Sequence, residues 1–217
     1  GNGTNGRLVK DMFFDGNQYL YIAIDFGGIN RYDLLKKKFE YNVENEKDEN
    51  SLNSNSLWVL YKDYESILYA GTAVSGINIY NPKKDRFKTY RHNINNPNSL
   101  VFNVVYKFFE DSKGLVWVAT DGGGVSVFDP KKKSFKNFQF NPDNRNSLSG
   151  NAIISITEDK NNNIWLGTWG AGLNKFDRKT ELFYRYMPNK NVAQSISNAN
   201  IWDLYTDKLG HIWISYN

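Results

Sequence analysis

The chain has 217 residues, a formal net charge of +4 and no cysteine, and aromatic residues make up 16% of it. This length allows one or two domains with a buried core, and the missing thiols exclude a disulfide framework, a cysteine-ligated metal centre and a thiol nucleophile. Its two histidines, His92 and His211, lie far apart in the sequence, so neither a histidine-based metal site nor a catalytic triad is expected. The small charge does not indicate binding to nucleic acid.

The sequence contains neither a membrane-spanning pattern nor a signal-peptide pattern. No apolar run approaches the roughly 18 residues of a membrane-spanning helix. The sequence begins Gly-Asn-Gly-Thr, with neither an initiating methionine nor a charged and apolar signal segment. We therefore expect a segment of a longer polypeptide.

A repeat of 48 residues runs through the whole sequence, and such a period is typical of solenoids and propellers. An aromatic residue recurs at this spacing, and an aspartate recurs six residues before it. Glycine, threonine and phenylalanine columns keep the same register. The aromatic column is Tyr21, Tyr69, Trp117, Trp165 and Trp213, and the aspartate column is Asp15, Asp63, Asp111, Asp159 and Asp207.

Each repeat contains four short strand patterns, which we name A to D, separated by turn residues. No segment carries a helical apolar period that is long enough for a helix. Four-stranded antiparallel sheets repeated end to end indicate the blades of an all-β fold, the β-propeller. In chain order, we expect blades at about residues 8–42, 57–91, 103–139 and 152–187, followed by strands A and B of a half blade at 200–217. These about 4.5 blades form an incomplete β-propeller, because propellers typically close on themselves with four to eight blades.

The repeated positions are assigned to the scaffold. Strand A is expected to be innermost, with Leu57 on one face and Trp58 and Leu60 on the other. The aromatic column is expected to be buried on strand B. Each aspartate of the column is expected to form a turn in which its carboxylate accepts hydrogen bonds from its own backbone, without a catalytic or metal-binding role.

Glycine and other small residues mark two further positions of the repeat. The segment Asp121–Gly124 is interpreted as a tight B-to-C turn with positive φ, since no helix follows it as it would follow a phosphate loop. The residue two positions after the aromatic column is always small, as at Gly71 and Gly167. We expect it to let neighbouring blades approach closely.

Several segments resemble the repeat of the two-component regulator propeller family. They are Asn98-Ser-Leu, Phe109–Gly114, Val116–Val125 and Phe128-Asp-Pro in the third blade, and Ile164–Asp177 in the fourth. The resemblance implies that the chain is part of a seven-bladed ring in the extracytoplasmic sensor region of a Bacteroides-type hybrid two-component system. It also implies a periplasmic location, in a protein that is anchored in the inner membrane and carries a histidine kinase.

The function implied by this resemblance is non-catalytic ligand sensing, in which glycan fragments control polysaccharide-utilisation genes. The expected partners are an oligosaccharide ligand, the rest of the propeller, the downstream sensor domains and a second copy of the full-length protein, with no nucleic acid and no cofactor. Two alternatives stay open. The chain could be a protein-interaction scaffold like the WD-repeat propellers or, as a weaker alternative, part of a propeller lyase or hydrolase whose active site lies in other blades.

Candidate ligand-binding residues are those on the face that carries the B-to-C turns and the D-to-A connections. An aromatic ring there can stack on a sugar, although Trp169 could instead pack on a neighbouring loop, and carboxylate and amide groups can hydrogen-bond to hydroxyls. The asparagines before strand A could instead cap the loops in which they stand. The candidate residues are Asp25, Phe26, Asn55, Asn103, Asp121, Asn151 and Trp169.

The opposite face is expected to carry basic C-to-D turns. These turns could be solvated lysine-rich connections or, in a functional interpretation, an anion-binding surface. Their basic residues are Lys36–Lys38, Lys83, Lys84, Arg86, Lys131–Lys133, Arg178 and Lys179.

Overall fold

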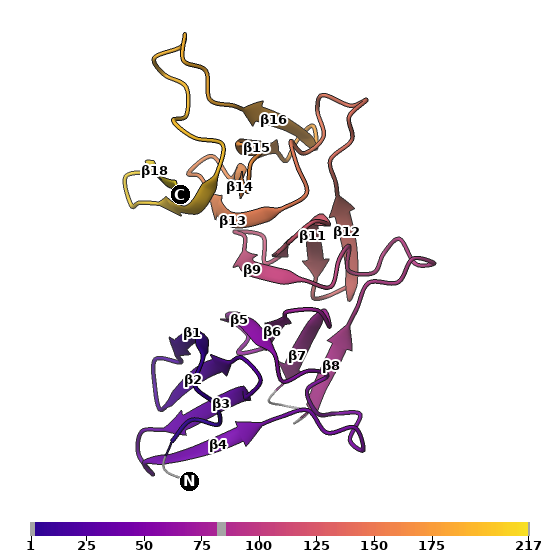
Figure 1. Ribbon diagram of the computed structural model, residues 1–217, viewed down its shortest axis with the longest axis vertical. Coiled ribbons are helices and arrows are strands. Elements are labelled where there is room, and N and C mark those ends of the chain that lie inside the picture. The colour runs from indigo at the N-terminus through magenta and orange to yellow at the C-terminus, as the bar shows by residue number, and fades with distance from the viewer. Residues whose placement is uncertain (1–2, 82–85, 217) are drawn as a thin grey trace. The chain divides into compact units, whose positions relative to one another are not determined.

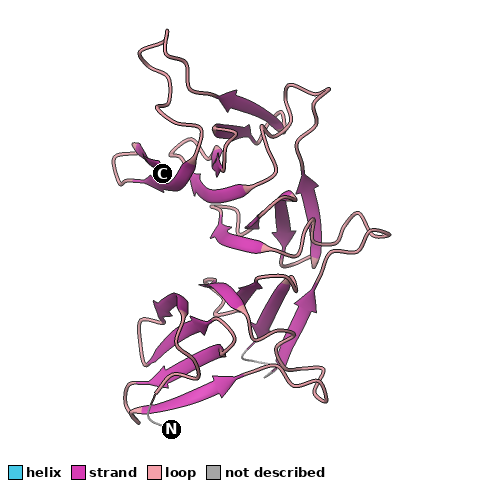
Figure 2. Ribbon diagram, in the orientation of Figure 1, coloured by secondary structure: helices cyan, strands magenta, loops and turns pink. Residues whose placement is uncertain are grey.

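The computed structural model describes residues 3–81 and 86–216, and every helix or strand within them is a β-strand (Figures 1 and 2). These strands form four four-stranded sheets and one two-stranded sheet, and within each sheet the strands are adjacent in chain order. Sheets of this kind are the blades of propellers, so the all-β fold predicted from the repeat is confirmed. The described residues contain no helix that is long and apolar enough to cross a membrane.

The strands have the following bounds. The first two sheets consist of β1 (Val9–Phe14), β2 (Tyr19–Ile24), β3 (Gly28–Asp33) and β4 (Lys38–Asn42), and of β5 (Leu57–Lys62), β6 (Leu68–Thr72), β7 (Ile77–Asn81) and β8 (Arg86–Tyr90). The next two consist of β9 (Val105–Glu110), β10 (Val116–Thr120), β11 (Gly124–Asp129) and β12 (Ser134–Phe138), and of β13 (Ile153–Glu158), β14 (Ile164–Thr168), β15 (Leu173–Asp177) and β16 (Leu182–Tyr186). The two-stranded sheet consists of β17 (Ile201–Thr206) and β18 (Ile212–Tyr216).

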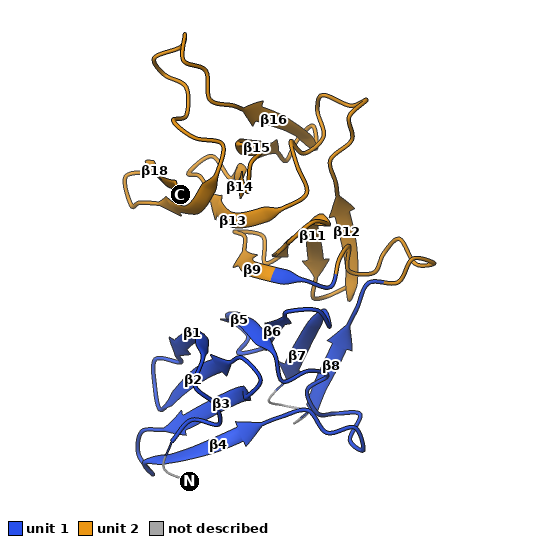
Figure 3. Cartoon of the chain, viewed as in Figure 1, with its two compact units in different colours: residues 1–92, 103–105 blue, residues 93–102, 106–217 orange. Residues whose placement is uncertain are grey.

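The chain divides into two compact units, each with a core of its own (Figure 3). Unit 1 comprises residues 1–92 and 103–105, and unit 2 comprises residues 93–102 and 106–217. In unit 1, β5 packs against β1 and β2, and in unit 2, β17 packs against β13 and β14. The core of unit 1 includes Ala23, Ile29, Leu52, Leu57, Leu60 and Phe87, and that of unit 2 includes Trp117, Val125, Leu148, Ile153, Leu166 and Phe176.

Close packing between successive sheets depends on the small residue after the aromatic column. A Cβ atom added to Gly71 would lie 2.6 Å from the Cγ1 atom of Val105, and one added to Gly167 would lie 2.5 Å from the Cγ2 atom of Ile201. Real Cβ atoms do not approach other carbons so closely, because packed interiors have no room for such overlap. The predicted role of these small residues is therefore confirmed.

The aspartate column forms the predicted turns between the first and second strands. The Oδ1 atom of Asp111 accepts hydrogen bonds from the backbone N–H groups of Lys113 and Leu115, at 2.8 and 3.1 Å. Asp15, Asp63, Asp159 and Asp207 accept hydrogen bonds from the backbone of their own turns in the same way. These hydrogen bonds hold the turn between the first two strands of each sheet, as the aspartate column predicted.

A second hydrogen bond, which the repeat pattern did not predict, connects the aspartate and aromatic columns. The indole Nε1–H of Trp117 donates to Oδ2 of Asp111 at 2.7 Å, and the Trp165–Asp159 and Trp213–Asp207 pairs repeat this bond at 2.8 and 2.9 Å. In the second sheet the Tyr69 hydroxyl donates to Asp63 at 3.1 Å. The six-residue offset therefore places each ring beside the carboxylate of its own turn.

Burial of the aromatic column is confirmed in part. Tyr69 and Trp117 are 2% and 1% exposed, whereas Tyr21 and Trp165 are half-buried. For Trp213 the prediction is wrong, because this side chain is 62% exposed. Its strand, β18, pairs only with β17 among the described residues, so no third strand lies along its other edge.

The predicted faces of strand A are wrong, because a β-bulge interrupts the alternation near the start of the strand. On β5, Leu57 pairs with Thr72 and Leu60 with Ala70, so the two leucines share one face, and Trp58 is the extra residue between them. The same register shift falls at Lys10, Ile154 and Trp202. A bulge turns the extra residue away from the regular pleat, and the column Lys10, Trp58, Ile154 and Trp202 is therefore not part of the regular strand faces.

The Asn-Ser-Leu segments connect successive sheets. Leu52, Leu100 and Leu148 are at most 2% exposed. Beside each leucine, the backbone carbonyl of the asparagine accepts a hydrogen bond from the last strand of the following sheet, as in Phe135 N–H to Asn98 at 3.1 Å. The segments thus close the outer sheet edge, which would otherwise leave backbone groups unpaired.

Candidate functional site

In unit 2 the turns after β10 and β14 lie side by side, and they carry two of the predicted ligand-binding residues. Asp121 forms an antiparallel bridge with Ala152, and the Ala152 carbonyl accepts a hydrogen bond from the backbone N–H of Trp169 at 3.0 Å. Both side chains are exposed. The structure therefore brings Asp121 and Trp169 to opposite sides of one residue at the start of β13.

Trp169 has an aromatic partner that the sequence analysis missed. Its ring lies 5.9 Å from that of Trp202, at an interplanar angle of 66°. The two side chains are 47% and 54% exposed, so this edge-to-face pair presents two indole faces to solvent. Trp202 is the bulged residue of β17. Trp202 stands in a column of the repeat that shares no residue type, so the period gives no signal for it. The column is Lys10, Trp58, Tyr106, Ile154 and Trp202.

Tyr106, at the start of β9, lies near the same turn. Burial raises the pKa of the Tyr106 phenol, and the negative charge of Asp121 raises it further. We call Tyr106, Asp121, Trp169 and Trp202 the aromatic patch of unit 2.

Unit 1 places the other two B-to-C turn candidates, Asp25 and Phe26, in a different environment. The Asp25 carboxylate accepts a hydrogen bond from the Ser56 hydroxyl, and Lys10 lies 3.7 Å from it. The Lys10 ammonium also lies 5.5 Å from the centre of the Trp58 ring, within the range of a cation–π contact. Phe26 has a φ of 61° and is 83% exposed, so a bulky side chain occupies a strained turn and points to solvent.

The three candidate asparagines, Asn55, Asn103 and Asn151, act on the loops. The side-chain oxygen of each accepts a backbone N–H at 2.7 Å, from Glu44, His92 and Phe140 respectively. Their backbone carbonyls accept a further bond from the preceding B-to-C turn, as in Gly124 N–H to Asn151 at 2.7 Å. These contacts agree with the loop-capping alternative, and a role in ligand binding stays a prediction.

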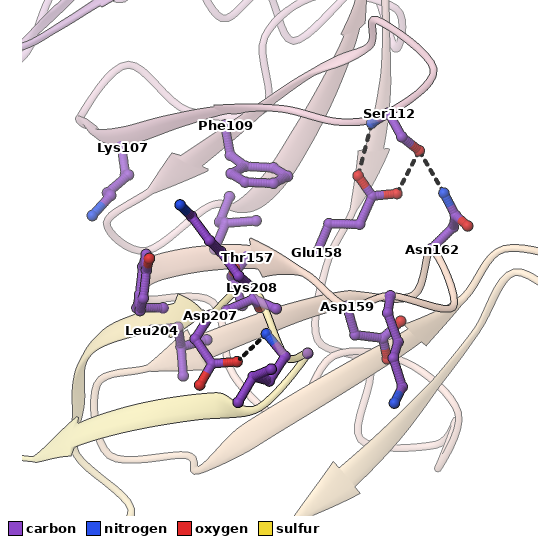
Figure 4. A pocket seen from close by; sticks show the side chains of 16 residues that line it. Lys107, Phe109, Ser112, Thr157, Glu158, Asp159, Asn162, Leu204, Asp207 and Lys208 are labelled. Atoms are coloured by element: carbon purple, nitrogen blue, oxygen red, sulfur yellow. Dashed lines mark hydrogen bonds between the residues drawn. The ribbon is translucent and has the colours of Figure 1, made fainter.

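A pocket of about 620 Å³ lies elsewhere in unit 2, between the ends of β9, β13 and β17 (Figure 4). Figure 4 shows Phe109 and Lys107 above it and Asp207 and Lys208 below it. Its lining residues Asp159, Thr206 and Gly210 follow Asp111, Glu158 and Asn162 by one repeat. Those three earlier residues bind the Arg178 side chain, so the pocket is the counterpart of a site that Arg178 fills one repeat earlier.

The carboxylates around this pocket are all engaged by the protein. Glu158 accepts hydrogen bonds from the backbone and hydroxyl of Ser112, both at 2.7 Å, and from Arg178 at 3.0 Å. Asp159 is bound by the Trp165 indole, and Asp207 by the Trp213 indole and by His211 at 3.1 Å. Among the residues that the structure describes, no group of three or more histidine or acidic residues could hold a metal ion.

Two turn aspartates of unit 2, Asp159 and Asp207, have pKa values below their usual range because of the hydrogen bonds that they accept. Burial tends to raise the pKa of Asp159, but the hydrogen bonds from Trp165 and Asn163 outweigh it and lower the pKa. The Trp213 indole, followed by His211, lowers the pKa of Asp207 to about 2. Both groups are therefore ionised at neutral pH and serve the scaffold.

The basic C-to-D turns do not form the uniform surface that the sequence suggested. Arg178 is only 11% exposed and lies 2.9 Å from Asp111 and 3.0 Å from Glu158, so its inclusion in an anion-binding surface is wrong. Lys36 and Lys132 lie within 4 Å of the aspartate that begins their own turn, at 3.8 and 3.6 Å. Lys83 and Lys84 lie outside the described residues.

Comparison with solved structures supports the propeller assignment. The extracellular domain assigned to a hybrid two-component system of B. thetaiotaomicron matches with a TM-score of 0.70 and 22% identity, over 98% of this chain and 32% of that chain. PorZ, a surface component of the type-IX secretion system of Porphyromonas gingivalis, matches with a TM-score of 0.67 and 15% identity, over 95% and 31%. The WD40 propeller domain of Doa1 matches with 0.62 and 14%, over 95% and 60%. The fold is thus that of β-propeller blades, and the chain spans about a third of the length of the first two proteins.

Two segments of the chain identify its repeats. Residues 99–122 and 147–170 match the sequence profile of the family described as two component regulator propeller. They begin at the serine of the Asn-Ser-Leu segment and cover the first two strands and the start of the following turn of the third and fourth sheets. These two segments therefore match the two-component regulator propeller repeat, as their motifs suggested. No curated protein matches the sequence significantly.

Proposed function

We propose that this chain is part of the ligand-sensing propeller of a membrane-anchored two-component sensor kinase, and that it recognises glycan fragments in the periplasm. The family of its repeats and its similarity to extracellular domains of such systems support a sensory propeller. The proposal includes the kinase, the membrane anchor, the remaining blades and the downstream sensor domains. It also includes dimerisation of the full-length protein and control of polysaccharide-utilisation genes.

The observation that carries the glycan assignment is the Trp169–Trp202 pair. Two half-exposed indoles at 66° to each other come from the turn after β14 and from the bulge of β17. Exposed tryptophan pairs of this kind suit the apolar face of a pyranose ring, while nearby polar groups bind its hydroxyls. The pocket in Figure 4 has no pair of tryptophans: its carboxylates are engaged, and its aromatic residues are the half-buried Phe109 and the exposed Tyr205.

Signalling requires more than binding at this site. A ligand shifts an equilibrium between two arrangements only if its affinity for them differs. The propeller would therefore report a glycan through a changed contact with its attached domains, and the described residues would contribute recognition without chemistry.

A glycan array with the wild-type chain tests the proposal, followed by calorimetry with the best-binding oligosaccharide. Trp169→Ala should weaken binding at least tenfold, because it removes one of the two stacking faces. Tyr184→Ala is the matched control, since Tyr184 on β16 is 46% exposed and Trp169 is 47% exposed. Unchanged affinity in Trp169→Ala would place recognition elsewhere, and an array with no binding would contradict the glycan assignment.

A further inference from the structure

The two turn aspartates Asp25 and Asp121 stand two repeats apart, and the scaffold treats them differently. The Asp25 carboxylate is held by the Ser56 hydroxyl and by Lys10, and its side chain is only 12% exposed. Lys10 neutralises it, so Asp25 contributes little net charge to the surface of unit 1. Asp25 thus serves as the reference for a carboxylate at this repeat position whose charge is compensated.

At Asp121 both of these partners are replaced. The residue two repeats after Lys10 is Tyr106, and the residue two repeats after Ser56 is Ala152. Neither side chain carries a positive charge, and Ala152 has no polar side-chain atom. In the parts of the chain that the structure describes, no salt bridge or side-chain hydrogen bond engages the Asp121 carboxylate, which is exposed. The influence of its charge on Tyr106 places the negative potential beside that ring.

The Asp121 carboxylate and the tryptophan pair are separated by about the distance between adjacent sugar rings. Asp121 and Trp169 flank Ala152 on either side, so their backbones are separated by two strand spacings, on the order of 10 Å. This separation fits adjacent sugar rings of an oligosaccharide. A pyranose stacked on Trp169 and Trp202 would place a substituent of the next ring over Asp121. A protonated amine there would gain an ion pair with the carboxylate and a cation–π contact with the aromatic rings.

We propose that the aromatic patch of unit 2 binds amino sugars, that is, saccharides with a protonated amine, in preference to neutral or acidic ones. The inference rests on the proposed function and names the class of glycan that the same site takes. An exposed ion pair and a cation–π contact are each modest, and together they predict about fivefold tighter binding of the amine. An acidic sugar would meet repulsion from Asp121.

Calorimetry with four matched tetrasaccharides tests the inference. The probes are the β-1,4-linked tetramers of glucosamine, N-acetylglucosamine and glucose, together with tetragalacturonate. We expect the glucosamine tetramer to bind about five times tighter than the glucose tetramer, tetragalacturonate to bind weakest, and added salt to reduce the difference. Asp121→Asn should reduce the preference for the glucosamine tetramer over the glucose tetramer, because it removes the ion pair and leaves the cation–π contact. Asp25→Asn should leave their ratio unchanged, because Asp25 already has Lys10 as its counterion.

The outcomes separate the two proposals. Equal binding of the glucosamine and glucose tetramers, lost in Trp169→Ala, would overturn the amino-sugar inference and keep the glycan site. An undiminished preference for glucosamine in Asp121→Asn, or tighter binding of tetragalacturonate, would also overturn the inference. If neither the four probes nor the glycan array gives binding, the proposed function fails with it.

Discussion

Trp117 and Trp213 occupy the same position of the repeat, but their environments differ. Each donates its indole N–H to the aspartate of its own turn, at 2.7 and 2.9 Å. Trp117 is nevertheless 1% exposed in a four-stranded sheet, and Trp213 is 62% exposed in the two-stranded one. The comparison teaches that the turn hydrogen bond is a local property of one hairpin, whereas burial of the ring comes from further strands.

Replacement of the two tryptophans by alanine should give the largest difference. Trp117→Ala should lower the free energy of unfolding by about 3–5 kcal/mol, because a large buried ring leaves a cavity. Trp213→Ala should cost about 1 kcal/mol or less, and the half-buried Trp165 should fall between them. Urea unfolding followed by circular dichroism measures these losses. Equal losses at Trp117 and Trp213 would show that the hydrogen bond, and not packing, determines the contribution.

Loss of a turn aspartate should depend on what else its carboxylate binds. Asp111→Ala removes the acceptor for Trp117 and for Arg178, a guanidinium that is only 11% exposed, so the cost should be about 2–4 kcal/mol. Asp15→Ala is the control, since its Oδ2 atom lies 4.0 Å from the Lys62 ammonium. Asp15→Ala should lower the free energy of unfolding by less than Asp111→Ala does. If Arg178→Met restores the stability of Asp111→Ala, the lost ion pair between Arg178 and Asp111 is the cause; if it does not, the turn itself is.

The pH dependence should have opposite signs in two members of the aspartate column. The pKa of Asp207 falls from 3.8 to about 2, chiefly through the Trp213 indole, so its stabilising contribution is complete above pH 4 and is lost as the pH falls towards 2. Burial raises the pKa of Asp63 above 3.8, so protonation of Asp63 favours the fold. Stability–pH profiles of Asp207→Asn and Asp63→Asn measure both effects. Asp207→Asn should lose stability relative to wild type at pH 7 but not at pH 2, and the reverse pattern would contradict the assignment.

The smallest effect on stability should come from the aromatic patch. Trp169→Ala should change the free energy of unfolding by about 1 kcal/mol or less, because the ring is 47% exposed and stands at a turn position where other repeats have aspartate or alanine. The same urea titration as for Trp117 provides the measurement. A loss as large as that of Trp117→Ala would make Trp169 part of the scaffold.

The sequence predicts those features that depend on contacts within one repeat. The strands and the self-bonded aspartate turns follow from the unbroken 48-residue period and from turn chemistry that acts over four residues. The faces of the first strands were predicted wrongly, because a bulge at Trp58 or Ile154 leaves no composition signal. Arg178 was assigned to the surface, because its partner Asp111 is 67 residues away and belongs to the preceding sheet.

The candidate site could be predicted only in part for a similar reason. Asp121 and Trp169 stood out because they depart from the repeat. Trp202 was missed because it lies in an irregular column, and its partnership with Trp169 depends on how two successive sheets pack. The 48-residue period also does not indicate that the chain divides into two units, because it continues unbroken through the sequence.

The central claim is that repeated residues hold the scaffold and that departures from the repeat bind the ligand. Glycan binding and the thermal midpoint of the double variant Trp169→Ala/Trp202→Ala, measured on one preparation, test it most directly. The account predicts that binding of the best-binding oligosaccharide is lost while the midpoint stays within a few degrees of wild type. Retained binding, or a midpoint lowered as far as that of Trp117→Ala, would contradict it.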